Sequence, residues 1–384
     1  MEHLINPHVK GIEISGIRKF YNMVSEIDNV LSFTIGLPDF PTPLHIKDKA
    51  IEAIQRDCTT YTHNAGLLEL RQEVARFMNT YYSLEYHPTD EILITVGASE
   101  AIDIAFRTIL SPGDEVILPG PVYPGYEPLI QLAGAKAVHV DTRHQSFKMT
   151  ADLIADVMSE RTKCIVLPYP SNPTGVSLSK DELEDIANLL KGKDVFILAD
   201  EIYSELTLDR QHFSIGSILR DQTITINGLS KSHSMTGWRI GFLMAPKAIV
   251  QHMIKVHQYN VSCASSVSQM AALEAMRNGQ HDPADMRKEY KKRRDYVFKR
   301  LTSMNLQTVL PDGAFYFFIK LPNGFKNSFD FALQLVQKEK IAVVPGSAFS
   351  DYGEGYFRFS YAVSMETLEE GLDRLEHFLI STRK

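Results

Sequence analysis

Cysteine is scarce in this sequence of 384 residues, which contains only three. Cys58, Cys164 and Cys263 lie far apart, form no CxxC pair and have no histidines at metal-ligand spacing. The sequence therefore predicts neither a disulfide framework nor a metal site. Such cysteine usage is typical of proteins in a reducing cytoplasm.

Long apolar runs are also missing. No window approaches the roughly 20 apolar residues that a membrane-spanning helix needs. The N-terminal sequence MEHLINPHVKGIEISG lacks the uninterrupted apolar core of a signal peptide. We therefore expect a soluble, cytoplasmic protein that has no membrane partner.

A net positive charge is absent as well, since the formal net charge is −7. An acidic protein is a poor match for nucleic acid or an anionic membrane. The basic stretch RKEYKKRR (287–294) is a local exception, which we interpret as the solvated face of a helix. The motifs GxGxxG, Walker A, HExxH and GxSxG do not occur, which removes the usual support for dinucleotide-binding, P-loop, zinc-protease and serine-hydrolase functions.

What the sequence does contain is a series of short apolar runs that alternate with helical patterns. The runs are ILITV (92–96), EVILPG (115–120), KCIVLP (163–168), VFILAD (195–200), TITING (223–228) and IGFLMAP (240–246). They are nearly continuous in apolar residues, as expected for strands buried on both faces. Helices are predicted between them over 99–110 and over 180–190, where Ser179 and Glu182 have capping-box spacing. The pattern predicts an α/β fold with a mostly parallel sheet covered by helices.

The chain is longer than one core usually supports, so we expect two domains. A long charged helix is predicted from about residue 269 to 300, followed by the hairpin-like segment LQTVLPDGAFYFFIKL (306–321). A helix over 328–338, strands over 341–345 and 356–362, and a closing amphipathic helix complete a smaller C-terminal α/β domain. The predicted units are an N-terminal arm (1–35), a large domain (36–270) and a small domain (271–384). The arm is expected to pack against the small domain or a partner subunit.

The most informative stretch is SKSHSMTGWRIG (230–241), which follows the predicted strand TITING. Lys231 lies between two predicted strands and is flanked by small hydroxyl residues such as Ser230. Burial and nearby positive charge lower the pKa of an amine, which makes it a nucleophile toward an aldehyde. Arg239 offers a fork of donors that suits a phosphate group. A loop lysine beside a structural arginine is the simpler alternative for Lys231 alone, but it explains the whole string poorly.

Asp200 ends the predicted strand VFILAD, and Tyr203 follows in the sequence DEIY. Open parallel sheets bind ligands at the carboxyl ends of their strands. A carboxylate in that place can stabilise a protonated ring nitrogen, and a tyrosine hydroxyl can donate to a phenolic oxygen of the same ring. Taken in isolation, a helix N-cap aspartate and a packing tyrosine are the favoured alternative.

Three further turns carry candidate residues. Asn172 opens the sequence NPTG after the strand KCIVLP, although a turn alone explains its proline and glycine. Gly97, Ala98 and Ser99 close one strand and open a helix, where backbone amides can approach a phosphate. Tyr123, in PGPVYPGY, can stack on an aromatic cofactor, although proline-rich loops often carry tyrosines without such a function.

Together these motifs resemble the class I and II aminotransferases, which have fold type I and use pyridoxal 5′-phosphate. The resemblance extends from IGLPDF (35–40) to FRFS (357–360), and the lysine string is its most specific part. It implies that Lys231 binds the cofactor covalently and moves the proton, while Asp200 pairs with the ring nitrogen. The other implied cofactor contacts are Asn172 and Tyr203 at the ring hydroxyl, Tyr123 on the ring face, and Gly97, Ala98, Ser99, Ser230 and Arg239 at the phosphate.

The same resemblance implies that Arg358 binds the α-carboxylate of the substrate, with help from Asn172 and the backbone of Gly36. It also implies that Tyr61, in TYTHNAG (60–66), reaches the cofactor phosphate of a neighbouring subunit, so a homodimer is expected. Gly228 departs from the pattern, because many relatives have serine or threonine there as a phosphate donor. One phosphate hydrogen bond is therefore in doubt.

The implied reaction moves an amino group between an α-amino acid and a 2-oxo acid by ping-pong kinetics. The segments PYPSNPTGV, INGLSKSHSMTGWRIGF and VHQYNVSCASS are similar to Gram-positive bacterial members assigned to N-acetyl-L,L-diaminopimelate. That similarity predicts 2-oxoglutarate and glutamate as the second pair of substrates, in lysine biosynthesis. Two alternatives stay open, a C–S β-lyase that uses the same cofactor and a non-catalytic regulator that binds it.

Overall fold

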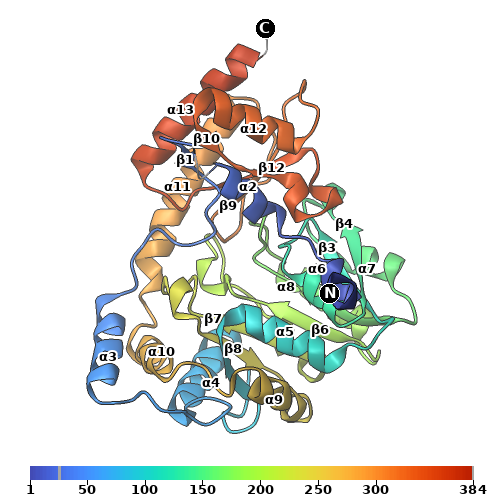
Figure 1. The fold of residues 1–384 in the computed structure, drawn as a ribbon, viewed down its shortest axis with the longest axis vertical. Helices are drawn as coiled ribbons and strands as arrows, with labels where there is room; N and C mark the ends of the chain where they lie inside the picture. Colours follow the sequence, from blue (N-terminus) through green and yellow to red (C-terminus); the bar gives the residue numbers. More distant parts are fainter. Residues whose placement is uncertain (25–26, 383–384) are drawn as a thin grey trace.

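The computed structural model describes residues 1–24 and 27–382. Its largest sheet has seven strands in the order β2-β8-β7-β6-β5-β3-β4 (Figure 1). Only β8 in this sheet runs antiparallel to its neighbours, so the predicted mostly parallel sheet is confirmed. The strands are β2 (Ile92–Thr95), β3 (Glu115–Gly120), β4 (Lys136–Asp141), β5 (Thr162–Leu167), β6 (Phe196–Asp200), β7 (Thr223–Gly228) and β8 (Gly241–Met244).

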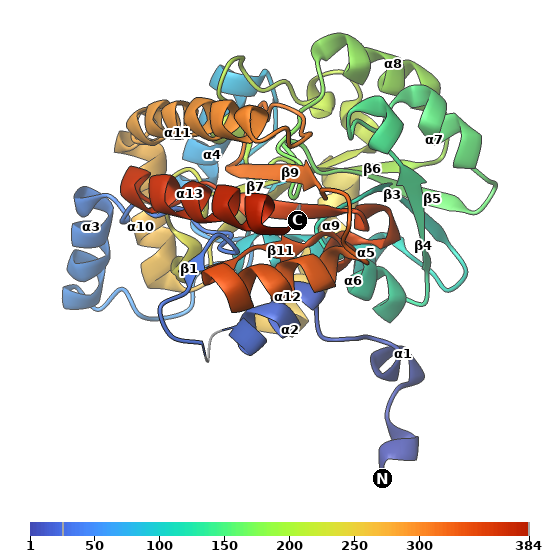
Figure 2. The same cartoon turned by 90° about the horizontal axis from the view of Figure 1, so that it is seen from above.

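Successive side chains of the central strands enter two different hydrophobic cores. Val116 and Leu198 pack with α5 (Gly97–Ile109), α6 (Tyr126–Leu132) and α9 (Lys247–Val261). Ile117 and Ile197 face the opposite side, with α7 (Ala151–Val157) and α8 (Lys180–Leu190), which Figure 2 shows across the sheet from α5. Because both faces are covered, each strand position favours an apolar residue, which explains the continuous apolar runs.

A third group of helices covers the β2–β8 edge of the sheet. It consists of α3 (Leu44–Gln55), α4 (Leu68–Tyr82) and α10 (Ser266–Asn278), which pack against one another. The helix predicted over 180–190 is present as α8, and the Ser179–Glu182 capping box is formed.

A smaller sheet lies above the carboxyl ends of the large one in Figure 1. Its order is β11-β12-β9, and a separate two-stranded pair joins β1 to β10. Helices α11 to α13 surround a core rich in phenylalanine and tyrosine. The elements are β9 (Tyr316–Lys320), β10 (Ile341–Ala342), β11 (Val344–Pro345), β12 (Tyr356–Ser360), α11 (Pro283–Ser303), α12 (Ser328–Glu339) and α13 (Met365–Thr382).

Several predicted elements are wrong in detail. The single helix over 269–300 is two helices, because helical structure is interrupted between Asn278 and Pro283. The strand over 341–345 is also two, since β10 pairs with β1 and β11 pairs with β12. The hairpin-like segment contributes β9 and two isolated bridges, Thr308 with Ile319 and Gly313 with Thr207. The edge strand β4 was not predicted. The domain limits stay predictions, and the limit at 270/271 falls within α10.

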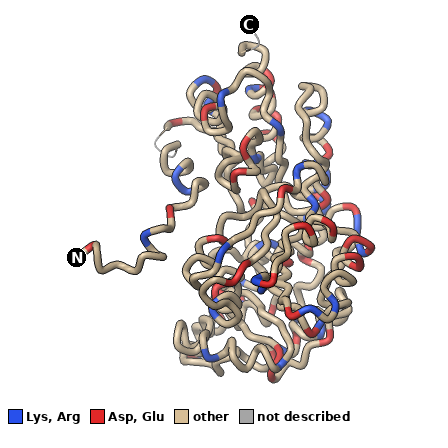
Figure 3. The backbone as a smooth tube through the Cα atoms, turned by 90° about the vertical axis from the view of Figure 1, so that its right-hand side faces the viewer, with Lys and Arg blue, Asp and Glu red and all other residues tan. Residues whose placement is uncertain are grey.

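The N-terminal segment has two parts. Helix α2 (Gly16–Val24) packs against β11 of the small sheet, and β1 (Leu31–Ser32) pairs with β10 of the same chain, where Leu31 lies opposite Ile341. The preceding residues project from the rest of the chain in Figures 2 and 3, where the short helix α1 (Pro7–Lys10) comes close to α6, and Leu4 and Ile14 are exposed. Charges of both signs are spread along the tube in Figure 3. Across residues 1–24 and 27–382, no helix is long and apolar enough to cross a membrane.

Candidate active site

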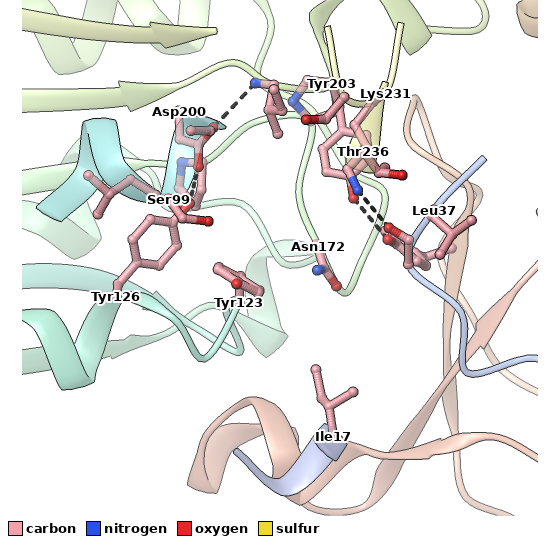
Figure 4. A pocket seen from close by; sticks show the side chains of 18 of the residues that line it. Ile17, Leu37, Ser99, Tyr123, Tyr126, Asn172, Asp200, Tyr203, Lys231 and Thr236 are labelled. Atoms are coloured by element: carbon pink, nitrogen blue, oxygen red, sulfur yellow. Dashed lines mark hydrogen bonds between the residues drawn. The ribbon is translucent and has the colours of Figure 1, made fainter. Parts of the chain in front are cut away.

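A cavity of about 370 Å³ lies where the carboxyl ends of the large-sheet strands face the small sheet. It gathers most of the predicted site residues from segments more than 300 positions apart (Figure 4). The predicted residues that line it are Gly36, Ala98, Ser99, Tyr123, Asn172, Asp200, Tyr203, Ser230, Lys231, Arg239 and Arg358.

Lys231 lies just beyond the carboxyl end of β7, and its amine points into the cavity. The Nζ atom donates a hydrogen bond of 2.6 Å to the carbonyl oxygen of Gly36. Burial, followed by the positive charges of Arg358 and Arg239, lowers the pKa of Lys231 to about 8. The amine is therefore much closer to its uncharged, nucleophilic form at neutral pH than an ordinary lysine is.

Asp200 ends β6 on the floor of the same cavity and is 7% exposed. Its Oδ2 atom accepts a hydrogen bond of 2.7 Å from the Tyr126 hydroxyl, and Oδ1 accepts one of 3.2 Å from the Ile202 N–H (Figure 4). Burial raises the pKa of Asp200, while these two hydrogen bonds oppose the rise. A cationic partner in the cavity would favour the ionised form further.

Tyr203 and Tyr316 meet beside Lys231. Their hydroxyl oxygens are 2.8 Å apart, and burial raises the pKa of both phenols, so both keep their protons. The Lys231 Nζ atom lies 5.7 Å from the centre of the Tyr203 ring.

Arg358, in the middle of β12, is only 2% exposed although it reaches the cavity. Its Nη1 donates to the Asn172 Oδ1 at 2.7 Å, and its Nη2 donates to the Thr34 carbonyl oxygen at 2.7 Å. The Nε atom is buried and has no hydrogen-bond partner among the described residues. A guanidinium fixed in this way presents a fork of donors to a carboxylate.

The turn from β2 into α5 forms a cradle with Arg239. Gly97 has φ +79°, and a Cβ atom there would lie 2.6 Å from the Arg239 Nη2. Ala98 and Ser99 follow in the first turn of α5, where backbone N–H groups are free to meet an anion. The combination of a helix start and a close guanidinium suits a phosphate group.

Gly228 is explained by the close approach of β7 and β8. A Cβ atom on Gly228 would lie 3.1 Å from both the Gly241 Cα and the Ile240 carbonyl oxygen. A serine there would have to displace backbone. The cradle therefore has no hydroxyl side chain at this position.

Two predicted residues do not line the cavity of their own chain: Gly97, whose neighbours Ala98 and Ser99 do, and Tyr61, which has 86% of its surface exposed. Tyr123 lines the cavity and packs edge to face with Tyr126 at 5.7 Å between ring centres. Sequence reasoning missed Tyr126, Tyr316 and Ile17 as lining residues. Tyr126 carried a signal, since it lies only three residues beyond Tyr123, where α6 begins.

The sequence profile described as Aminotransferase class I and II matches residues 28–375. The chain belongs to this family. A probable N-acetyl-LL-diaminopimelate aminotransferase of Bacillus subtilis (strain 168) is 62% identical over 384 residues, covering 100% of this chain and 98% of the relative. An aspartate aminotransferase of Pyrococcus abyssi is 41% identical, covering 98% of this chain and 96% of the relative. The solved structure of Thermus thermophilus aspartate aminotransferase with maleate has a TM-score of 0.93 and 32% identity, covering 97% of this chain and 99% of that one.

The predicted family, fold and enzyme class are thereby confirmed. The protein is an aminotransferase with fold type I, and aminotransferases of this family are generally dependent on pyridoxal phosphate. Their substrates are small molecules, namely amino acids and 2-oxo acids.

Proposed function

We propose that this aminotransferase holds pyridoxal 5′-phosphate covalently on the Lys231 Nζ atom. The observation that carries the proposal is a single buried amine, with its pKa lowered to about 8, pointing into the cavity between the two sheets. An aldehyde carbon needs such an uncharged amine as its partner.

The remaining residues of the cavity fit the rest of the cofactor. Asp200 would face the ring nitrogen, since its carboxylate is buried and held in one orientation by two hydrogen bonds. Asn172 uses its Oδ1 atom on Arg358, which leaves its amide N–H groups for the ring oxygen. Tyr203 would bind the same oxygen and Tyr123 the ring face. Gly97, Ala98, Ser99, Ser230 and Arg239 would hold the phosphate.

The cofactor, once bound, supplies an electron sink for the bond that breaks at the substrate Cα. Arg358 would bind the α-carboxylate with its fork of donors, together with Asn172 and the backbone of Gly36. The Lys231 amine would then take the proton from the substrate Cα and give it to the cofactor carbon that carries the amino group. Its hydrogen bond with the Gly36 carbonyl oxygen holds the amine at the carboxylate end of the cavity.

For the amino donor we propose N-acetyl-L,L-diaminopimelate, with 2-oxoglutarate as the acceptor, in lysine biosynthesis. The support is the 62% identity over the full chain to the Bacillus subtilis relative of that name. Aspartate is the alternative donor, because relatives at 41% and 32% identity are named aspartate aminotransferases.

We further propose a cytoplasmic homodimer in which Tyr61 of one chain reaches the cofactor phosphate of the other. The position of Tyr61 supports this proposal, because its ring lies outside the cavity of its own chain and, with 86% of its surface exposed, can meet a second chain.

A panel of amino donors with 2-oxoglutarate tests the proposed function. We expect glutamate formation to be fastest with N-acetyl-L,L-diaminopimelate, and borohydride reduction followed by peptide mass analysis to place the cofactor on Lys231. Label on another lysine would contradict the cofactor assignment, and a faster rate with aspartate would contradict the donor. Release of pyruvate and ammonia from a sulfur amino acid would reveal a β-lyase reaction.

A further inference from the structure

Tyr316 makes contacts that its place in the core does not explain. It begins β9, is fully buried and yet lines the cavity. Its neighbours Phe315 and Phe317 fill the same core without a hydroxyl group. A buried hydroxyl without a hydrogen-bond partner would destabilise the fold, so the Tyr316 hydroxyl should have a partner near the cavity.

The hydroxyl of Tyr316 is directed at Tyr203. The two oxygens are 2.8 Å apart, and Gly36 leaves the space, since a Cβ atom there would lie 3.1 Å from the Tyr316 oxygen. One of the two phenols must donate to the other. If Tyr316 donates, the hydrogen of Tyr203 is free to point into the cavity.

The ring of Tyr316 supports a second residue. The central carbon of the Arg358 guanidinium lies 4.4 Å from the ring centre, a cation–π contact away from water. The hydrogen bonds of Arg358 to Asn172 and Thr34 fix its two Nη atoms, and the ring fixes the face of the guanidinium. One side chain thus contacts both the proposed cofactor donor and the proposed carboxylate clamp.

We propose that Tyr316 is a positioning residue for amino transfer, with a different task for each of its two parts. The hydroxyl donates to Tyr203 and so turns the Tyr203 hydrogen toward the cavity. The ring holds the plane of Arg358 in the orientation that receives a carboxylate. The inference rests on the proposed function, because it requires a cofactor oxygen facing Tyr203.

The hydroxyl is tested with four enzymes loaded with cofactor: wild type, Tyr316→Phe, Tyr203→Phe and the double variant. The measurement is the midpoint of the pH titration of the visible absorbance of the bound cofactor. Loss of a donor to an anionic oxygen raises the proton affinity of that oxygen. We expect Tyr203→Phe to raise the midpoint by about one pH unit and Tyr316→Phe by about half a unit. The double variant should match Tyr203→Phe.

The possible results distinguish the role of the Tyr316 hydroxyl from the proposed contact of Tyr203 with the cofactor. If Tyr203→Phe leaves the midpoint unchanged, the proposed contact of Tyr203 with the cofactor fails. If Tyr203→Phe moves the midpoint and Tyr316→Phe does not, or if the Tyr316→Phe shift persists in the double variant, the role of the Tyr316 hydroxyl is overturned. Tyr361→Phe is the matched control, because Tyr361 lies in the same core and donates to the Ala314 carbonyl oxygen at 3.1 Å. It should leave the midpoint where it is.

The ring is tested by the dissociation constant of maleate, a carboxylate that undergoes no amino transfer. Tyr316→Phe keeps the ring and should bind maleate within about twofold of wild type, whereas Tyr316→Leu should bind about tenfold more weakly. If Tyr316→Leu does not fold, Tyr316→Met takes its place. Unchanged binding in a folded variant without the ring would overturn the role of the ring.

Discussion

The two walls of the cavity are built in different ways. The large-sheet wall consists of residues at the carboxyl ends of β2, β6 and β7, such as Ser99, Asp200 and Lys231, each within a few residues of its strand. The small-sheet wall is assembled from Gly36, Tyr316 and Arg358, which come from distant parts of the chain. The residues of the first wall are brought together because their strands are neighbours in the sheet. Those of the second wall are brought together by contacts between distant segments.

This difference separates most of the residues proposed to bind the cofactor from Arg358, which is proposed to bind the substrate. The large-sheet wall carries the amine, the carboxylate and the phosphate cradle on a framework buried on both faces. The small-sheet wall carries one guanidinium, already held by an amide and a backbone carbonyl. We therefore expect changes in the first wall to affect the rate of the reaction and changes in the second to affect substrate binding.

Lys231→Ala should have the largest effect, since it removes the proposed covalent site and the proposed proton carrier at once. We expect turnover to fall by at least about 10⁴-fold and the visible absorbance of the lysine-bound cofactor to disappear. The circular dichroism spectrum should stay that of the wild type. Lys247→Ala, which removes an exposed partner of Asp90, is the control and should keep full activity. Transamination by the Lys231→Ala protein at the wild-type rate, without added amine, would refute the assignment.

Asp200→Asn tests the same wall without touching the covalent link. An amide cannot stabilise positive charge on a ring nitrogen, so we expect kcat to fall by about 10²–10³-fold while the cofactor stays bound. The Tyr126 hydroxyl can still donate to the amide oxygen, which keeps the geometry. A kcat within threefold of wild type would show that Asp200 has only a structural role.

Arg358→Ala tests the small-sheet wall. The KM of every α-amino acid donor should rise by about 10²-fold, whatever its side chain, because the buried clamp for the shared carboxylate is lost. The absorbance of the bound cofactor should persist, in contrast to Lys231→Ala. If only one class of substrate suffers, Arg358 reads side chains and another residue binds the α-carboxylate.

The depressed pKa of Lys231 links the two walls, because Arg358 and Arg239 both contribute to it. In the cofactor-free protein the folded state loses the lysine proton at about pH 8, whereas an ordinary lysine loses it near 10.5. The unfolded chain binds more protons between these values, so the free energy of unfolding contributed by Lys231 rises with pH across this window. In urea unfolding, the free energy of unfolding of wild type minus that of Lys231→Met should increase between about pH 8 and pH 10.5. Parallel curves would contradict the shift.

The two walls also differ in how many of their residues could be predicted from the sequence. Asp200 ends one predicted strand and Lys231 follows another, but each residue alone also had a structural explanation, and the resemblance of the combined motifs to the aminotransferases singled them out. Tyr316 could not be predicted, because an aromatic residue within AFYFF reads as core, and its hydroxyl partner is 113 positions away. Strand β4 was missed because KAVHVD is short, half polar and only partly buried at the edge of the sheet. The break between α10 and α11 had a signal in Gly279 and Pro283, which the surrounding charged pattern obscured.

Tyr61 belongs to neither wall of the cavity in its own chain. Its substitution should have the smallest effect of those considered, and that effect tests whether two chains share each active site. Its ring is exposed, but its loop is fixed: the fully buried Gln269 donates to the Thr62 hydroxyl at 2.9 Å and accepts from the Leu67 N–H at 2.7 Å. A rigid loop that presents an uncovered tyrosine suits a contact with a second chain. Tyr61→Phe should therefore weaken cofactor binding by only about tenfold, the low end of what one hydrogen bond to a charged group contributes.

Subunit exchange shows which chain Tyr61 serves. Lys231→Ala chains, which keep Tyr61, are mixed with Tyr61→Phe chains, which keep Lys231. If each tyrosine serves the neighbouring site, the mixed dimer contains one site with both residues intact, and half of its sites regain wild-type cofactor affinity and activity. If each tyrosine serves its own chain, every site in the mixture that keeps Lys231 also carries the Tyr61→Phe substitution, and the weak affinity persists. Demonstrated exchange without recovery, or an active enzyme that sediments as a monomer, would contradict the shared site. Recovery would make the partner's loop a third wall of the cavity.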